Sequence, residues 1–207
     1  MRSALLLSFI AAMLVANWLI EQKPAVQTSR SDIVYRSCEL QLGEETLVDL
    51  HDRVSAVLTD KDSTVQAMVF ALLAVEMANR GPVRRQVEVA MVRLAYHLPG
   101  VTENTLAKRS LGIAQIQLGH VLRRDRSLSL LQAIEQLNDE KTSMQLAAGL
   151  VEEWCRENQF LLPQDISALA TCYNSGTDTT YKSAYSLYPE VVEAFYWRYL
   201  SQIGEGR

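Results

Sequence analysis

The sequence predicts an all-α protein, and three observations favour this class. The chain has 207 residues, 48% of them hydrophobic, which is enough for one domain with a substantial core and an N-terminal appendage. Beyond about residue 33, apolar residues recur at steps of three and four, which is the spacing of one helix face. No alternating run of Val, Ile or Thr of strand length interrupts this pattern. We therefore expect helices packed around a single core.

The first element is a hydrophobic N-terminal segment. Residues 4–20 contain only two polar side chains, Ser8 and Asn17. About 20 apolar residues cross a bilayer as a helix, and signal peptides carry a similar but shorter apolar region. Residues 1–21 are therefore expected to form a membrane-targeting helix, either a retained anchor or a cleaved signal peptide. Trp18 favours the anchor because Trp suits the membrane interface.

A linker and a series of helices follow. Residues 22–32 are polar and aperiodic, so we expect a linker there and the globular domain over residues 33–207. Asp62-Ser63, Gly81-Pro82 and Thr102-Glu103 are helix-start signals. The expected helices span residues 44–58, 63–77, 82–97, 102–108, 113–122, 129–137, 142–158, 163–173, 179–186 and 188–202.

The charge pattern excludes one class of partner. The net charge is -4, with acidic and basic residues mixed along the chain. A nucleic-acid partner is not expected, because no basic surface stands out to neutralise a phosphate backbone. His51, His97 and His120 show no metal-ligand spacing with any Cys or carboxylate, so we expect neither a metal site nor another cofactor.

The three cysteines permit at most one internal disulfide. Cys155 and Cys172 are the most plausible pair because they fall on consecutive expected helices. The alternative is that all three cysteines are small, buried apolar residues.

Glu76 stands near the end of a strongly apolar expected helix, residues 63–77. Partial burial and the negative end of the helix dipole both disfavour a charged carboxylate there, so its pKa is expected to be raised. A general acid requires such a pKa. The alternative is a surface glutamate paired with Arg80, four residues later.

Residues 112–116 read Gly-Ile-Ala-Gln-Ile. Gly112 lets backbone come close to a ligand, and the Gln115 amide can donate to and accept from sugar hydroxyl or acetamido groups. The alternative is a helix start.

Residues 172–176 read Cys-Tyr-Asn-Ser-Gly, which is typical of a helix end capped by glycine. In a functional interpretation, the Tyr173 hydroxyl binds Glu76 and fixes its rotamer, while Asn174 binds substrate or holds the turn.

Taken in order, these fragments resemble the lytic transglycosylase branch of the lysozyme-like superfamily. That family has an apolar helix ending in Glu, then Gly-x-x-Gln-Ile, a Gly-containing helix and Tyr-Asn-x-Gly. The third piece here is residues 144–154, and the resemblance covers about residues 63–199. It implies a lobed globule with a glycan-binding groove. The implied catalytic residues are Glu76 and Tyr173, and the implied substrate-binding residues are Gly112, Ile113, Gln115 and Asn174.

The resemblance implies cleavage of the bond between N-acetylmuramic acid and N-acetylglucosamine in peptidoglycan. Glu76 would protonate the glycosidic oxygen and then, as carboxylate, take the proton of the muramic C6 hydroxyl, which leaves a 1,6-anhydro sugar. One carboxylate suffices because the nucleophile is intramolecular. Arg84 and Arg85 can meet lactyl or peptide carboxylates of the glycan, although two arginines opening a helix are also typical of a solvated surface.

Several alternatives stay open. Met77 replaces the serine that usually follows the catalytic glutamate, so a catalytically silent peptidoglycan-binding or scaffold module remains possible. A hydrolytic muramidase requires a second carboxylate, for which Glu88 and Glu103 are nearest in sequence. A helical adaptor with coincidental motifs is the third alternative.

The resemblance also implies a location. Arg2 precedes the hydrophobic segment and Lys23 follows it, so flanking charge leaves the orientation open. A peptidoglycan substrate places the domain in the periplasm. It would be anchored in the inner membrane by residues 1–21, or secreted into the periplasm after signal cleavage.

Overall fold

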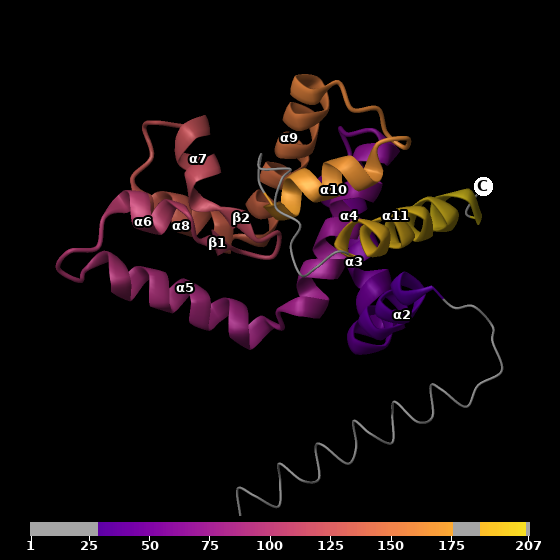
Figure 1. The fold of residues 1–207 in the computed structure, drawn as a ribbon, viewed down its shortest axis with the longest axis horizontal. Helices are drawn as coiled ribbons and strands as arrows, with labels where there is room; N and C mark the ends of the chain where they lie inside the picture. Colours follow the sequence, from indigo (N-terminus) through magenta and orange to yellow (C-terminus); the bar gives the residue numbers. More distant parts are fainter. Residues whose placement is uncertain (1–28, 176–186, 206–207) are drawn as a thin grey trace, which may run out of the picture. The chain divides into compact units, whose positions relative to one another are not determined.

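Helices form almost all the regular structure of residues 29–175 and 187–205, which are the residues that the computed structural model describes (Figure 1). The elements are α2 (Arg30–Leu42), α3 (Glu44–Val57), α4 (Ser63–Asn79), α5 (Pro82–Tyr96), α6 (Glu103–Ala107), β1 (Ser110–Leu111), β2 (Ile116–Gln117), α7 (Leu118–Arg124), α8 (Leu130–Asn138), α9 (Glu140–Asn158), α10 (Ile166–Ser175) and α11 (Tyr188–Glu205). The predicted all-α class is confirmed for these residues.

Most expected helices agree with the structure to within three residues, and the three start signals are confirmed at the N-termini of α4, α5 and α6. Two differences stand out: helix α2 was not expected and begins at Arg30, inside the expected linker, and the helix expected at residues 113–122 begins only at Leu118. The hydrophobic segment (residues 1–21) and the helix expected at residues 179–186 lie outside the described residues. Within the described part of the chain, no helix combines the length and apolarity needed to cross a membrane.

Helix α4 forms the centre of the core. Every residue from Ala67 to Glu76 is buried. A helix that is apolar on all sides is stable only when other elements surround it, and α3, α9 and α11 pack against α4. The side chain of Glu76 is therefore held inside the domain by the apolar residues that precede it.

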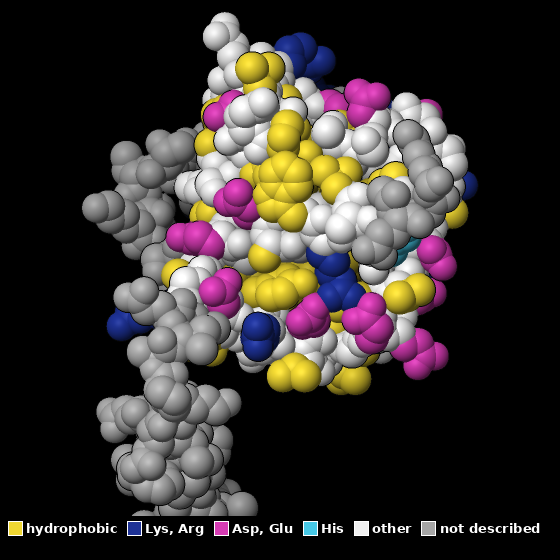
Figure 2. Space-filling view, turned by 90° about the vertical axis from the view of Figure 1, so that its right-hand side faces the viewer, with side chains coloured by type: hydrophobic (Ala, Val, Ile, Leu, Met, Phe, Trp, Pro, Cys, Tyr) yellow, Lys and Arg dark blue, Asp and Glu magenta, His cyan; other side chains and the backbone are white. Residues whose placement is uncertain are grey.

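Aromatic side chains join α11 to α4. The ring of Phe70 lies 5.2 Å from that of Tyr199 and 6.4 Å from that of Phe195. The Tyr199 hydroxyl donates to Gln66 at 2.7 Å and lies 2.8 Å from the Ser55 hydroxyl, so its polar end is satisfied inside the core. On the side where α2 and α11 lie, acidic, basic and apolar side chains are intermixed (Figure 2). Arg198 there pairs with Glu39 and with Glu44.

A short hairpin replaces the start of the helix expected at residues 113–122. Strands β1 and β2 are antiparallel, with Ser110 opposite Gln117. Between them, Gly112 and Gln115 both have left-handed backbone, with φ of 78° and 51°. A right-handed helix cannot continue through such residues, so helical structure begins only with α7 at Leu118.

The three cysteines are all free, so Cys155 and Cys172, the pair that the sequence offered for a bridge, form no disulfide. Cys38 and Cys172 are buried in the core, and Cys155 packs against it. The alternative interpretation, cysteines as small apolar residues, fits these positions.

We expect Gly112→Ala to destabilise the domain much more than Gly43→Ala. Both glycines have positive φ, which costs about 1–2 kcal/mol for a residue with a side chain. A Cβ at Gly43 meets open space, whereas one at Gly112 would lie 2.0 Å from the backbone carbonyl oxygen of Leu137. We expect this overlap with the Leu137 backbone to lower the free energy of unfolding of Gly112→Ala by at least a further 1–3 kcal/mol, roughly. Urea unfolding of the two variants measures this, and equal losses would contradict it.

Candidate functional site

A cavity of about 80 Å³ lies at the C-terminal end of α4. It brings together residues that are far apart in the sequence: Glu76 from α4, Gln115 from the hairpin, and Tyr173 and Asn174 from α10. Four of the predicted site residues therefore line one cavity. Other lining residues include Arg80, His120 and Trp154.

Glu76 is buried, with 8% of its surface exposed. Burial raises the pKa of its carboxyl, because the charged form loses solvation. A hydrogen bond from Tyr188 and the positive charge of Arg80 lower that pKa, and the charge of Glu88 raises it. The net direction is upward, as expected from the sequence, so the carboxyl is poised to hold a proton. The alternative of an exposed glutamate paired with Arg80 is wrong.

The phenol that holds Glu76 is Tyr188, not Tyr173. The Tyr188 hydroxyl donates to Glu76 Oε1 at 3.0 Å, and both groups are buried. Tyr173 instead donates to the carbonyl oxygen of Ala114, which fixes α10 to the hairpin loop. Burial and the nearby Glu76 raise the pKa of both tyrosines well above the usual range, so both hydroxyls keep their protons. The sequence singled out the tyrosine of a motif, whereas Tyr188 only begins a helix, a position without any functional signal.

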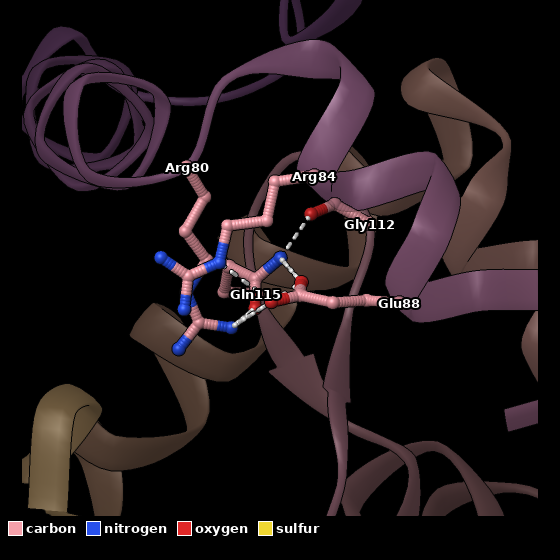
Figure 3. A network of polar contacts seen from close by, with 5 residues as sticks. All are labelled: Arg80, Arg84, Glu88, Gly112 and Gln115. Carbon is pink, nitrogen blue, oxygen red and sulfur yellow. Dashed lines mark hydrogen bonds and ion pairs between the residues drawn. The ribbon is translucent and has the colours of Figure 1, made fainter. Parts of the chain in front are cut away.

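The Gln115 amide is occupied by protein partners on both sides (Figure 3). Its nitrogen donates to the Gly112 carbonyl at 3.0 Å, and its oxygen accepts from the Arg80 guanidinium. The same guanidinium lies 3.5 Å from the Glu88 carboxylate, which Arg84 also approaches at 3.2 Å. This network connects the end of α4, the start of α5 and the hairpin. Gln115 thus holds the wall of the cavity in place.

Gly112 and Ile113, both expected to bind substrate, pack against the protein instead. Gly112 allows close approach, as expected, but the group it approaches is the backbone of Leu137 and not an open ligand site. Ile113 is buried in the core, with 7% of its surface exposed. Neither residue lines the cavity that contains Glu76.

Of Glu88 and Glu103, the two acidic residues considered as a second carboxylate, the structure brings Glu88 close to Glu76. Glu88 is near enough to Glu76 to raise its pKa. Its carboxylate, however, is engaged by Arg80, Arg84 and the Gln115 amide. Arg84 is thereby committed to Glu88, and neither Arg84 nor Arg85 lines the central cavity. In the described part of the chain, no group of His, Cys, Asp and Glu could hold a metal ion.

Two larger cavities adjoin the central one. One, of about 510 Å³ between α5, α6 and β1, shares Arg80 and Ser110 with it. The other, also about 510 Å³, lies beside α7 and α9 and shares His120, Leu150 and Trp154. The cavity that contains Glu76 is therefore continuous in its lining with two larger ones, which gives room for a ligand larger than the central cavity.

We expect Tyr188→Phe to raise the pKa of Glu76 further, because the hydrogen bond from Tyr188 favours the carboxylate. Tyr173→Phe is the matched control and should leave that pKa unchanged, since its hydroxyl donates to Ala114. NMR titration of side-chain carboxyls in the two variants measures the effect. A lower or unchanged pKa in Tyr188→Phe would show that this bond does not govern Glu76.

We also expect Glu76→Gln to stabilise the fold at neutral pH. A carboxyl whose pKa is raised by folding supplies stability below its ordinary pKa of 4.5 and loses it as pH rises through the folded pKa. The wild-type free energy of unfolding should therefore fall with rising pH relative to that of the variant. Parallel stability curves from acidic to neutral pH would contradict a buried, protonatable Glu76.

Comparison with known proteins gives this chain no relative. No family model, no curated protein and no solved structure matches it. Its function must therefore be argued from the cavity and the residues that line it.

Proposed function

We propose that the protein is a peptidoglycan lytic transglycosylase in which Glu76 is the catalytic acid and base. The observation that carries the proposal is a buried carboxyl with a raised pKa, hydrogen-bonded by a tyrosine, in a cavity that shares lining residues with two larger ones. A carboxyl whose pKa is raised keeps its proton to higher pH than an ordinary glutamate, and so can protonate a leaving oxygen. An extended polymer such as a glycan strand suits the flanking cavities.

In the proposed reaction, protonated Glu76 gives its proton to the glycosidic oxygen as that bond breaks. The muramic C6 hydroxyl attacks the anomeric carbon and passes its proton to the Glu76 carboxylate, which restores the acid and leaves a 1,6-anhydro ring. Tyr188 stabilises the transient carboxylate by donating to Oε1. The positive charge of Arg80 acts in the same direction, because it also lowers the cost of the charged form.

A single carboxylate is enough for this reaction, since the nucleophile belongs to the substrate. Hydrolysis normally uses a second carboxylate to activate water or to form a covalent intermediate. Glu88 is the nearby acid, but its carboxylate is occupied by Arg80 and Arg84 and does not line the central cavity. The environment of Glu88 therefore favours the lytic reaction over a muramidase.

The other site residues take distinct roles in the proposal. Asn174 is exposed at the cavity and is the amide available to substrate. Gln115 and Tyr173 position the hairpin, through Arg80 and the Ala114 carbonyl. Met77, the departure that favours a silent module, packs against the core and does not line the cavity, so it leaves the approach to Glu76 open.

The proposed substrate lies outside the cytoplasm. The proposal therefore puts the domain in the periplasm, held at the inner membrane by residues 1–21 or released after cleavage of that segment.

We expect the protein to release 1,6-anhydro muropeptides from purified peptidoglycan, and Glu76→Gln to lower the rate by roughly two to four orders of magnitude. Mass spectrometry of the soluble products distinguishes the reactions, because hydrolysis would give products heavier by one water. Glu135→Gln, which alters an exposed glutamate paired with Arg93, is the matched control and should keep full activity.

Three results would overturn the proposal. Hydrated reducing ends would indicate a muramidase. Binding to peptidoglycan without any release by the folded wild-type protein would indicate a silent module. Activity retained in Glu76→Gln would show that another residue is the acid.

A further inference from the structure

The cavity beside α7 and α9 has a basic wall. Arg123, Arg124 and Arg126 line it and lie within four residues of one another, in a protein whose net charge is -4. The cavity adjoins the Glu76 cavity through His120, Leu150 and Trp154. A charged subsite therefore lies directly beside the proposed catalytic centre.

The guanidinium of Arg124 occupies space that is open only because residue 149 is a glycine. Gly149 lies in α9, and a Cβ there would be 2.3 Å from one guanidinium nitrogen of Arg124 and 2.6 Å from the other. The guanidinium thus rests on the backbone of α9. Its only ion pair among the described residues is with Glu153, at a long 3.9 Å, so most of its donors stay available to a ligand.

The neighbouring arginines also keep donors free. Arg123 donates one bond to Nδ1 of His120, at 2.8 Å, and burial lowers the pKa of that histidine, so the ring is a neutral acceptor that does not cancel the arginine charge. Arg126 makes no ion pair with a described residue. The adjacent Asp125 carboxylate accepts hydrogen bonds from the Ser127 amide and hydroxyl, so it is bound within the turn that follows α7.

Two acidic residues of α9, Glu153 and Glu157, also line this cavity. The cavity therefore presents both guanidinium groups and carboxylates. This arrangement repels a compact dianion such as phosphate more than three arginines alone would, and it complements a ligand that bears both carboxylates and an amine.

We propose that this cavity binds the peptide stem of the glycan, with the stem carboxylates on Arg123, Arg124 and Arg126. This proposal rests on the proposed function, because it assigns part of the same substrate. The sequence suggested such a role for Arg84 and Arg85, but Arg84 is paired with Glu88 and neither lines the central cavity. Arginine suits this task because its planar fork binds carboxylates through two hydrogen bonds.

The test compares two substrates with the full chain: peptidoglycan strands that carry their stems, and the same strands after an amidase has removed them. Wild type should cleave the stem-bearing strands about tenfold faster, the factor expected from a charged hydrogen bond. Arg126→Gln should bring this ratio toward one. Arg156→Gln, an exposed arginine of α9 outside the cavity, should keep it.

Gly149→Ala is a sharper variant, because it leaves every charge in place. The new Cβ displaces the guanidinium of Arg124, while alanine is a better helix former than glycine, so the fold is kept. We expect this variant to lose the preference for stem-bearing strands as Arg126→Gln does. An unchanged ratio in both variants would overturn the proposal.

A binding measurement separates this proposal from the proposed function. Glu76→Gln should bind an isolated stem tetrapeptide in isothermal titration calorimetry, and Gly149→Ala in the same background should bind it about tenfold more weakly. Peptide binding without any cleavage by wild type would remove the catalytic proposal but keep the subsite. Absence of peptide binding, or equally tight binding of inorganic phosphate, would overturn the subsite.

Discussion

The burial of the Glu76 carboxyl at the end of α4 is the constraint on which the rest of the site depends. Helix α4 is surrounded by α3, α9 and α11 because it is apolar on all sides, and that burial carries Glu76 inside the domain. An isolated charge there would be costly, so the carboxyl gains a hydrogen bond from Tyr188 and a raised pKa. The packing that stabilises the core is therefore also the cause of the raised pKa of Glu76.

The walls of the cavity are held by a second polar network. Arg80, the residue directly after α4, binds both Gln115 and Glu88 and so connects the core helix to the hairpin and to α5. The hairpin is in turn held against α8 by Gly112, which has no side chain to keep the Leu137 carbonyl away. The Glu88 carboxylate is engaged in this network, and Glu76 is the one carboxyl among the described residues that line the central cavity.

The features that the sequence predicted correctly depend on residues close to one another in the chain. The helix starts at Ser63 and Pro82, and the burial of Glu76, follow from residues close to each position. The start of the helix expected at residues 113–122 was wrong, and the cause is local. The fragment after Gly112 has the periodicity of a helix, but left-handed backbone at Gln115 makes it a hairpin. Cysteine spacing cannot reveal whether two thiols meet, since that depends on how their helices pack.

By itself, the sequence determined the helical class, the extent of most helices and the identity of a carboxyl with a raised pKa, because these depend on spacing and burial within one segment. Only the tertiary structure decided which tyrosine binds Glu76, which arginines line a cavity and which glycines are required. Tyr188 lies 112 residues from Glu76 in the sequence, and Arg124 of α7 contacts Gly149 of α9. Such pairs form when packed helices bring distant segments together, and the periodicity of the sequence cannot predict them.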